Sequence, residues 1–194
     1  MKPVTLAAAL VVVLRLLVGC VSSTVSESDA RAVHQAVLDA HFEQDDWGQH
    51  GESLLILSDR LEVPEEDRGV PAQGDSRGVC LADHYPPSDA VADYDTKSER
   101  SRPLKAAFEL PIEYQLLGVG RWRQILTEEG GWMGYEMTWP GARRFVQLSD
   151  VGFDQAGTTA IVYVADNPEA AMLYVLRNED GKWQIVDGCM LWVS

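Results

Sequence analysis

Residues 145–193, FVQLSDVGFDQAGTTAIVYVADNPEAAMLYVLRNEDGKWQIVDGCMLWV, decide the fold of this 194-residue chain. They contain four runs rich in β-branched and aromatic residues, which predict strands over 145–151, 158–164, 171–177 and 182–193. The segments between these runs have the composition of turns. Connections this short make neighbouring strands antiparallel, so the stretch predicts a four-stranded antiparallel meander.

The last of these runs has one irregular position. Its apolar residues share one parity, which Asp187 also occupies: Trp183, Ile185, Cys189, Leu191 and Val193. Because neighbouring residues of a strand point to opposite faces, either Asp187 is buried or the backbone changes phase at Asp187-Gly188. We expect a β-bulge at Gly188, with a two-residue hairpin turn at Asp-Gly as the alternative. A buried Asp187 would be the best candidate for a carboxylate with a shifted pKa.

Residues 28–44 have the period of an amphipathic helix that can cover the sheet. Their apolar side chains recur at helical spacing: Ala30, Val33, Ala36, Val37 and Ala40. Ser28 is the expected N-cap. We therefore expect a single α+β domain over 28–194, with the N-terminal helix packed on the C-terminal antiparallel β-meander. This layout is similar to the NTF2-like and cystatin-like folds, and such a fold analogy implies no activity.

The middle of the chain gives weaker signals. Residues 52–62 predict a strand with a buried centre, which Pro64 ends. Residues 65–101 are rich in Asp, Gly, Pro and Ser and predict a long irregular loop. Loops of this length are uncommon in compact domains and are usually functional or disordered. Helices are expected over 101–110 and 121–129.

Four aromatic residues gather just before the meander: Trp122, Trp132, Tyr135 and Trp139. Such a cluster can form a platform for a glycan or an apolar ligand. Aromatic residues near helical spacing more often bury a helix against a sheet. We favour the core interpretation and keep the ligand platform as the alternative.

The start of the chain has the features of a secretory signal peptide. Lys2 precedes an apolar run over 6–14, which is shorter than the about 20 residues that cross a bilayer. Residues 17–20, Leu-Val-Gly-Cys, follow this run and resemble the lipobox of bacterial lipoproteins. The alternative is an ordinary secreted protein in which Cys20 is an incidental thiol.

The lipobox resemblance implies that residues 1–19 are removed and that Cys20 carries the lipid. Residues 20–27 are then a lipidated tether, and the lipid holds the protein at a membrane of the cell envelope. Val21, in place of Asp after the cysteine, implies the outer membrane if the host has one.

The meander carries a second resemblance. The segments 148–154 (LSDVGFD), 160–164 (AIVYV) and 181–183 (GKW) resemble the C-terminal pattern of a group of bacterial secreted proteins that has no assigned function. This resemblance implies secretion and transfers no catalytic residue.

Charge excludes one class of partner. The chain has 16 basic and 30 acidic residues. Removing Lys2 and Arg15 with the leader leaves 14 basic residues against 30 acidic ones, a formal charge of −16. Nucleic acid is therefore not expected as a partner, because contact with phosphates requires a basic surface.

Two cysteines remain after Cys20. Cys80 and Cys189 permit one disulfide in an oxidising envelope, closing a loop of roughly a hundred residues, and two buried free thiols are the alternative. We expect no metal site or cofactor. Cys80, Asp83 and His84 have no second ligand cluster, and His34 and His41 lie two helical turns apart, roughly 10 Å.

The sequence thus predicts a lipid-anchored envelope protein without an assigned activity. We expect a non-enzymatic module that binds an envelope protein or polymer through residues 65–101 and the Trp-rich region. One alternative is an envelope enzyme with a pocket on the open face of the sheet, using Asp187 or a histidine. The other is a purely structural lipoprotein.

Overall fold

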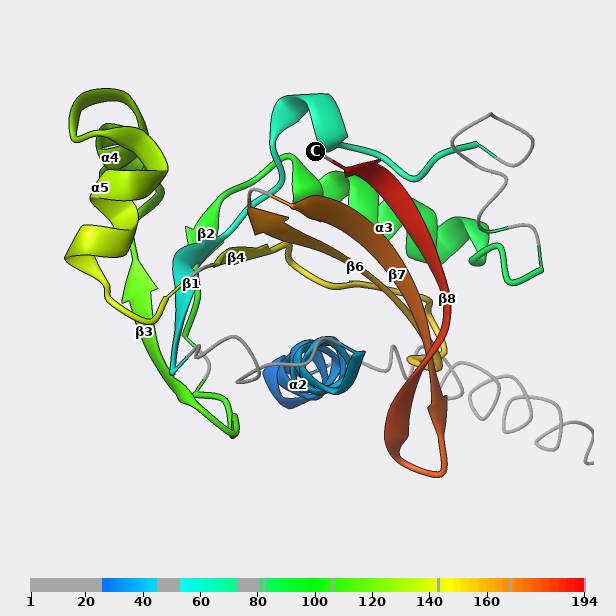
Figure 1. Cartoon of the computed structure of the whole chain (residues 1–194). Helices are drawn as coiled ribbons and strands as arrows, with labels where there is room; N and C mark the ends of the chain where they lie inside the picture. Colours follow the sequence, from blue (N-terminus) through cyan, green and yellow to red (C-terminus); the bar gives the residue numbers. More distant parts are fainter. Residues whose placement is uncertain are drawn as a thin grey trace, which may run out of the picture.

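The structure is a computed structural model that describes residues 26–44, 53–72, 81, 83–105, 107–142, 144–167 and 169–193. Within these residues the chain has four α-helices and one mixed sheet of eight strands (Figure 1). The predicted α+β class is therefore confirmed. The expected signal peptide and Cys20 lie outside the described residues.

The sheet is larger than the predicted meander. Its main path runs β2-β1-β4-β6-β7-β8, while β3 pairs with β1 and β5 pairs with β6. Strands β4, β6, β7 and β8 are antiparallel neighbours as expected, whereas β1 is parallel to both β3 and β4. The strand bounds are β1 Leu54–Leu61, β2 Arg102–Pro103, β3 Glu113–Leu117, β4 Phe145–Leu148, β5 Gly152–Phe153, β6 Thr159–Asn167, β7 Ala170–Glu179 and β8 Lys182–Val193.

Strand β6 is buried on both faces and lies at the centre of the sheet. Its alternate residues enter two different cores: Ala160, Val162 and Val164 on one face, Ile161, Tyr163 and Ala165 on the other. A strand covered on both sides is apolar at consecutive positions, which explains its unbroken apolar run.

Helix α2 (Glu27–Gln44) lies along the concave face of the curved sheet (Figure 1). Val33, Val37 and Leu38 share a core with residues of β1, β4, β6 and β7. The helix begins earlier than predicted, because Ser26 is the N-cap and not Ser28. Ser26 Oγ accepts from the backbone N–H of Asp29 at 3.3 Å, and Asp29 Oδ2 accepts from that of Ser26 at 3.0 Å, the reciprocal bonds of a capping box.

Three further helices cover the convex face: α3 (Ser88–Ser98), α4 (Val119–Glu128) and α5 (Gly131–Thr138) (Figure 1). Tyr94 of α3 packs in the core with β6, β7 and β8. Helices α4 and α5 form a third core with Ile56 of β1 and Phe145 of β4. None of the described helices is long and apolar enough to cross a membrane.

The prediction of a long irregular loop over 65–101 is wrong for the second half of this range, where residues 88–98 form α3. A short 3₁₀ helix, η1 (Glu65–Asp67), also lies in this range. The sequence signal was weak because α3 buries only one small stripe, made of Ala90, Tyr94 and Ser98. The helix starts directly after Pro87, whose extended backbone suits the residue before a first turn.

The helix predicted over 101–110 is also wrong. Arg102 and Pro103 form β2, an extended pair antiparallel to the end of β1. The residue before a proline is disfavoured in the α region, so Arg102 suits a strand. Leu104 then donates its N–H to the carbonyl of Asp59 at 2.8 Å, which ties the segment to β1.

The phase change predicted for β8 is confirmed, but its position is wrong. Val175 pairs with Asp187 and Leu176 with Ile185, so the bulged residue is Val186 and not Gly188. Trp183 and Ile185 consequently pack in the α2 core, while Cys189 packs in the α3 core.

Candidate functional site

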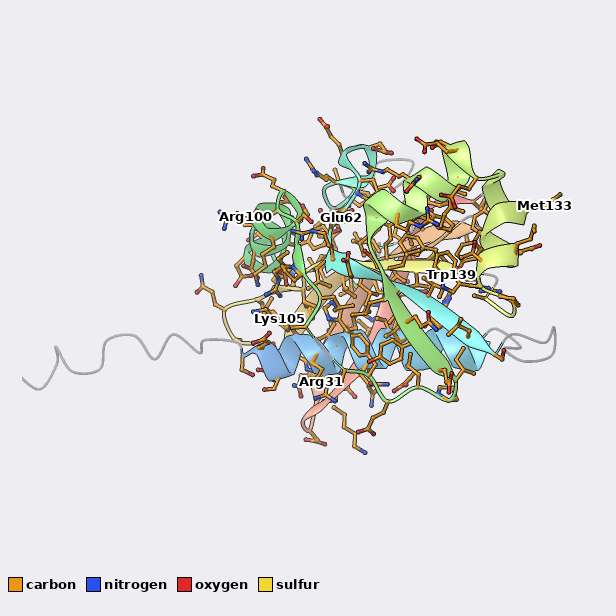
Figure 2. The ribbon with its side chains drawn as sticks, turned by 90° about the vertical axis from the view of Figure 1, so that its left-hand side faces the viewer. Arg31, Glu62, Arg100, Lys105, Met133 and Trp139 are labelled. Atoms are coloured by element: carbon orange, nitrogen blue, oxygen red, sulfur yellow. The ribbon has the colours of Figure 1, made fainter. Side chains whose placement is uncertain are left out.

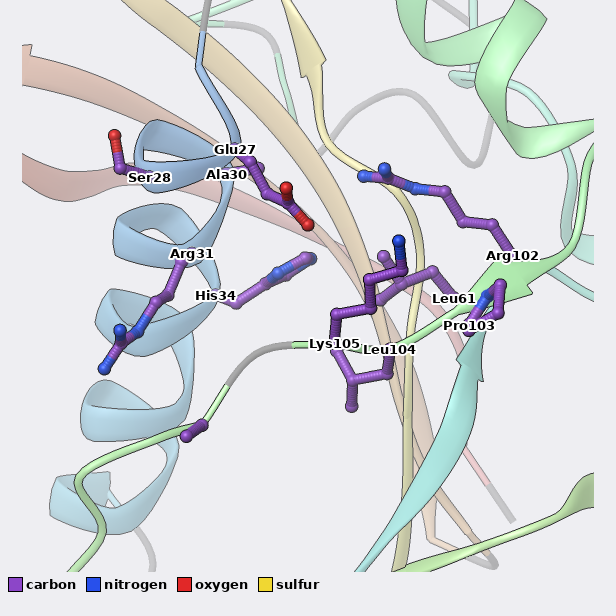
Figure 3. A pocket seen from close by; sticks show the side chains of 11 residues that line it. Glu27, Ser28, Ala30, Arg31, His34, Leu61, Arg102, Pro103, Leu104 and Lys105 are labelled. Carbon is purple, nitrogen blue, oxygen red and sulfur yellow. The ribbon is translucent and has the colours of Figure 1, made fainter.

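A cavity of about 570 Å³ opens between the first turns of α2 and the segment 102–107 (Figure 3). We call it the α2–β2 cavity. Its apolar wall consists of Ala30, Leu61, Pro103, Leu104 and Ala107. Its polar side chains are Glu27, Ser28, Arg31, His34, Arg102 and Lys105.

Local structure explains this gathering. Glu27, Arg31 and His34 are spaced at i, i+4 and i+7, which places them along one side of α2. The extended pair Arg102–Pro103 faces this side from the end of β1. Residues of α2 and β2 that are at least 68 positions apart in the sequence therefore meet around one cavity, because β2 closes the edge of the sheet beside α2.

His34 forms the buried floor of the cavity. Its Nε2 lies 2.9 Å from the carbonyl oxygen of Ser149, which can only accept, so Nε2 carries the proton. The ring also packs edge-on against Phe108, with 6.3 Å between the centroids. Burial lowers the pKa of His34 to about 4, although the bond to Ser149 opposes this shift. His34 is therefore neutral at pH 7 and contributes shape and polarity, not charge.

Arg102 is held at the wall by an ion pair. Its Nη2 donates to Asp150 Oδ1, which also accepts from the backbone N–H of Val151 at 2.8 Å. The Arg102 side chain remains 46% exposed, whereas that of Asp150 is 10% exposed. Asp150 thus anchors one edge of the guanidinium and leaves its other donors facing outward.

Three charges of the cavity have no partner among the described residues. Glu27, Arg31 and Lys105 form no side-chain hydrogen bond or ion pair with any residue that the structure describes. Glu27 and Lys105 extend toward the cavity from opposite walls, whereas Arg31 turns away along the outside of α2 (Figure 3). Unpaired charges of both signs around an apolar wall are suited to binding a charged small molecule.

The cavity lacks the arrangement of a hydrolase. Among its described lining residues the one hydroxyl side chain is Ser28, whose Oγ is hydrogen-bonded to Ser26 Oγ at 2.5 Å. The His34 proton is directed to Ser149, so His34 and Ser28 do not form a nucleophile–base pair. The geometry favours binding over covalent catalysis.

The core interpretation that we favoured for the Trp-rich region fits Trp122 and Tyr135. Trp122 and Tyr135 are buried, with ring centroids 5.0 Å apart, and Trp122 stacks on Phe145 at 4.4 Å. The structure does bring Trp132 and Trp139 against this cluster, where both are partly buried. The platform interpretation is therefore wrong for Trp122 and Tyr135.

A polar groove joins the two regions that the sequence analysis connected with a partner. It has a volume of about 510 Å³ and lies between η1, the end of α3 and the start of α4. Glu65, Glu66 and Glu99 line it from the range 65–101, and Trp122 and Arg123 line it from α4. The predicted binding regions thus meet at one groove, although the range 65–101 is partly helical.

Of the residues that the enzyme alternative could use, His34 lines the cavity, whereas Asp187, His41 and His84 do not. Asp187 Oδ2 is 3.8 Å from His84 Nδ1, too long for a hydrogen bond. His41 Nε2 lies 3.2 Å from Asp166 Oδ2, which also accepts from Arg144 at 2.6 Å. Within the described part of the chain no three potential metal ligands cluster.

Cys189 is disulfide-bonded. The other two cysteines, Cys20 and Cys80, lie outside the described residues, so the pairing of Cys80 with Cys189 stays a prediction. Leu81, the chain neighbour of Cys80, packs in the same core as Cys189, which supports that pairing.

Sequence reasoning did not identify the α2–β2 cavity. It considered His34 only as a metal ligand with His41, which it rejected, and it placed Arg102 and Lys105 on a helix that does not form. The spacing of Glu27, Arg31 and His34 was the one available signal, and it has no meaning until β2 is placed opposite. Comparison of the chain with protein-family models, curated proteins and solved structures finds no match.

Proposed function

We propose that this protein is a lipid-anchored protein of the cell envelope that binds, without chemical conversion, a compound carrying an anionic group in the α2–β2 cavity. The lipobox resemblance at residues 17–20 supports the anchor, and the outer membrane is the proposed location if the host has one. The membrane is reached through the lipid on Cys20.

One observation carries the binding proposal. The chain has nearly twice as many acidic as basic residues, yet Arg102 and Lys105 stand together at the cavity with donors that no described residue occupies. An unpaired ammonium beside a partly paired guanidinium attracts a carboxylate or phosphate. Neutral His34 and the apolar wall then accommodate the uncharged part of the ligand.

The tether places this cavity near the membrane. Ser26 lies six positions after Cys20, and a fully extended chain of that length spans about 20 Å. The cavity begins at Glu27, the first residue of α2. Its ligand is therefore proposed to be a component of the envelope or of its surface.

An envelope protein or polymer remains the proposed partner for the second surface, the groove between η1, α3 and α4. The specific support is that residues 65, 66, 68 and 98–101 line this groove together with Trp122 and Arg123. Acidic and basic side chains both line the groove, which suits a polar partner.

Titration of the mature chain tests the cavity. Amide NMR spectra are recorded with increasing inorganic phosphate and, separately, propyl phosphate. We expect saturable shifts at Arg31, His34 and Lys105. Lys105→Glu should weaken binding at least tenfold, while Lys182→Glu, at the β7–β8 turn and outside the cavity lining, should not. Absence of saturable shifts at the cavity, or equal effects of the two variants, would contradict the proposal.

A further inference from the structure

The α2–β2 cavity carries a negative charge as well as its positive ones. The carboxylate of Glu27 extends toward the cavity opposite Lys105 (Figure 3). Glu27 has no side-chain partner among the described residues. A simple anion held by Lys105 would therefore be repelled by a carboxylate across the same cavity.

The carboxylate of Glu27 also affects which ligands the cavity selects. A site discriminates between ligands partly through the charges that oppose the wrong one. An unpaired carboxylate beside bound phosphate disfavours a plain phosphate and favours a phosphate whose other end is cationic. An ammonium group supplies three donors, which matches the acceptor oxygens of Glu27.

We propose that the ligand of this cavity is a zwitterion in which a primary amine is joined to a phosphate. The amine binds Glu27, and the phosphate binds Lys105 and the outward donors of Arg102. The inference rests on the proposed function, because it specifies the ligand of the same cavity.

Arg102 can take this role despite its ion pair. Only Nη2 donates to Asp150, so Nε and Nη1 are not engaged by any described residue. A phosphate offers three oxygens to such donors, and Lys105 adds a second cation on the same wall. Asp150 fixes the guanidinium at the wall.

The uncharged part of the cavity fits the linker of such a ligand. Ala30 and Leu104 provide apolar wall between the two charged ends, and His34 beneath them is neutral at pH 7. A cavity of about 570 Å³ is in the range of small-molecule sites.

The net charge of the domain favours the same class. A mature chain of formal charge −16 repels phosphate dianions at long range, which slows their encounter. An aminophosphate meets less of this repulsion, because its ammonium group cancels one negative charge of the phosphate. The same chemistry occurs in a free aminophosphate and in the headgroup of an ethanolamine phospholipid, and the tether brings the cavity within about 20 Å of a bilayer.

Three probes separate the steps of this inference. The mature chain is titrated with phosphoethanolamine, propyl phosphate and inorganic phosphate, by calorimetry and amide NMR. We expect phosphoethanolamine to bind at least tenfold more tightly than propyl phosphate. Glu27→Gln should reduce this ratio to about twofold without weakening propyl phosphate. Glu136→Gln, on α5 at the other end of the molecule, is the matched control and should keep the full ratio.

The outcomes distinguish the two proposals. If Lys105→Glu abolishes binding of all three probes but Glu27→Gln leaves the tenfold preference intact, anion binding stands and amine recognition is overturned. If propyl phosphate binds as tightly as phosphoethanolamine to the unaltered chain, amine recognition is likewise overturned. If no probe binds the cavity, both proposals fail.

Vesicles identify the source of the ligand. A Cys20→Ser chain, which cannot be lipidated, is mixed with vesicles of phosphatidylcholine alone or with added phosphatidylethanolamine. Flotation that requires both phosphatidylethanolamine and Glu27 supports a lipid headgroup. Binding of free phosphoethanolamine without flotation supports a soluble aminophosphate. Flotation that is equal on both vesicles and insensitive to Glu27→Gln contradicts headgroup recognition.

Discussion

His34 of α2 donates a hydrogen bond of 2.9 Å from Nε2 to the backbone carbonyl of Ser149, which follows β4. The bond joins the helix to the sheet inside the core. Because the ring is buried, its pKa falls to about 4, below the usual value of about 6.5. The neutral ring is thus a requirement of the fold.

The first prediction concerns pH. The unfolded chain protonates His34 below about pH 6.5, whereas the folded chain resists protonation down to about pH 4. The contribution of His34 is fully present above pH 6.5 and is lost as the pH falls toward 4, by roughly 3 kcal/mol. Urea unfolding at pH 7.5, 6.0, 5.0 and 4.5 measures this loss.

His34→Gln is the matched variant for this prediction, because the amide keeps a donor for Ser149 and does not titrate. Other groups titrate in both proteins, so the difference between the two curves isolates His34. We expect the variant to lose less stability between pH 6.5 and 4.5. Parallel curves would show that His34 is not the titrating group.

The second prediction concerns Asp67 in η1. Its Oδ2 accepts from Tyr163 Oη at 2.8 Å and from Trp192 Nε1 at 2.9 Å, so one carboxylate joins β6 to the end of β8. Asp67→Ala leaves a buried phenol without an acceptor. We expect a loss of about 2–3 kcal/mol in unfolding free energy, measured by urea denaturation.

Glu66→Ala is the control for Asp67, because Glu66 is its exposed neighbour in η1 and should change stability by no more than about 0.5 kcal/mol. Burial and the contact with Asp67 raise the pKa of Tyr163 well above that of a free phenol. Equal stability of the two variants would mean that water replaces Asp67.

The strands β6 and β8, which Asp67 joins, contrast with β2 and show why the sequence predicted some elements and not others. β6, β7 and β8 follow one another through short turns, so local pattern and turn chemistry were sufficient to place them. β2 has only Arg102 and Pro103, and it is extended because it pairs with β1 some forty residues earlier. Neither propensity nor periodicity carries information about such a distant partner.

The same limit applied to the candidate site. His34 was visible as a polar residue beside an apolar stripe, but its partner Ser149 lies 115 residues away. The core position of Tyr94 could not be predicted either, because α3 has only a single narrow buried stripe. Its packing depends on a glycine in another element, and this dependence supports the third prediction.

The third prediction concerns Gly152 in β5. A Cβ at this position would overlap the backbone of Tyr94, because α3 lies directly on β5. Backbone cannot move aside as a flexible side chain can, so Gly152→Ala should cost about 2 kcal/mol or more. Thermal unfolding followed by circular dichroism measures the change.

Gly120→Ala is the matched control for Gly152. Gly120 lies in the first turn of α4, and a Cβ there meets nothing within 4 Å. Alanine should leave stability unchanged or raise it by up to about 1 kcal/mol. If Gly152→Ala were equally harmless, α3 would not pack on β5 as described.

The fourth prediction separates core from platform in the Trp-rich region. Trp122 is 4% exposed and contacts Trp132, Tyr135 and Phe145, whereas Met133 on α5 is 71% exposed. Met133 and Trp139 lie at the opposite end of the molecule from Arg100 and Lys105 (Figure 2). Trp122→Ala should cost about 3–5 kcal/mol, and Met133→Ala less than about 0.5 kcal/mol.

Stability and ligand binding together decide this case. A core role for Trp122 predicts reduced near-ultraviolet circular dichroism in Trp122→Ala and unchanged phosphoethanolamine affinity while the chain stays folded. A variant that keeps its full stability but loses affinity for a glycan would restore the platform interpretation.

The fifth prediction concerns Cys20 and tests the anchor on which the cavity's position depends. Intact mass of protein isolated from its host should correspond to a chain that starts at Cys20 and carries acyl chains. Two acyl chains contribute about 0.8 kcal/mol for each buried CH₂, enough to hold the protein at the membrane without basic residues. Cys20→Ser should therefore move it from the membrane fraction to the supernatant. Val21→Ser leaves the cysteine in place and should remain with the membrane. A chain cleaved elsewhere, without acyl mass, would remove the membrane from the proposal and leave a free aminophosphate as the ligand of the cavity.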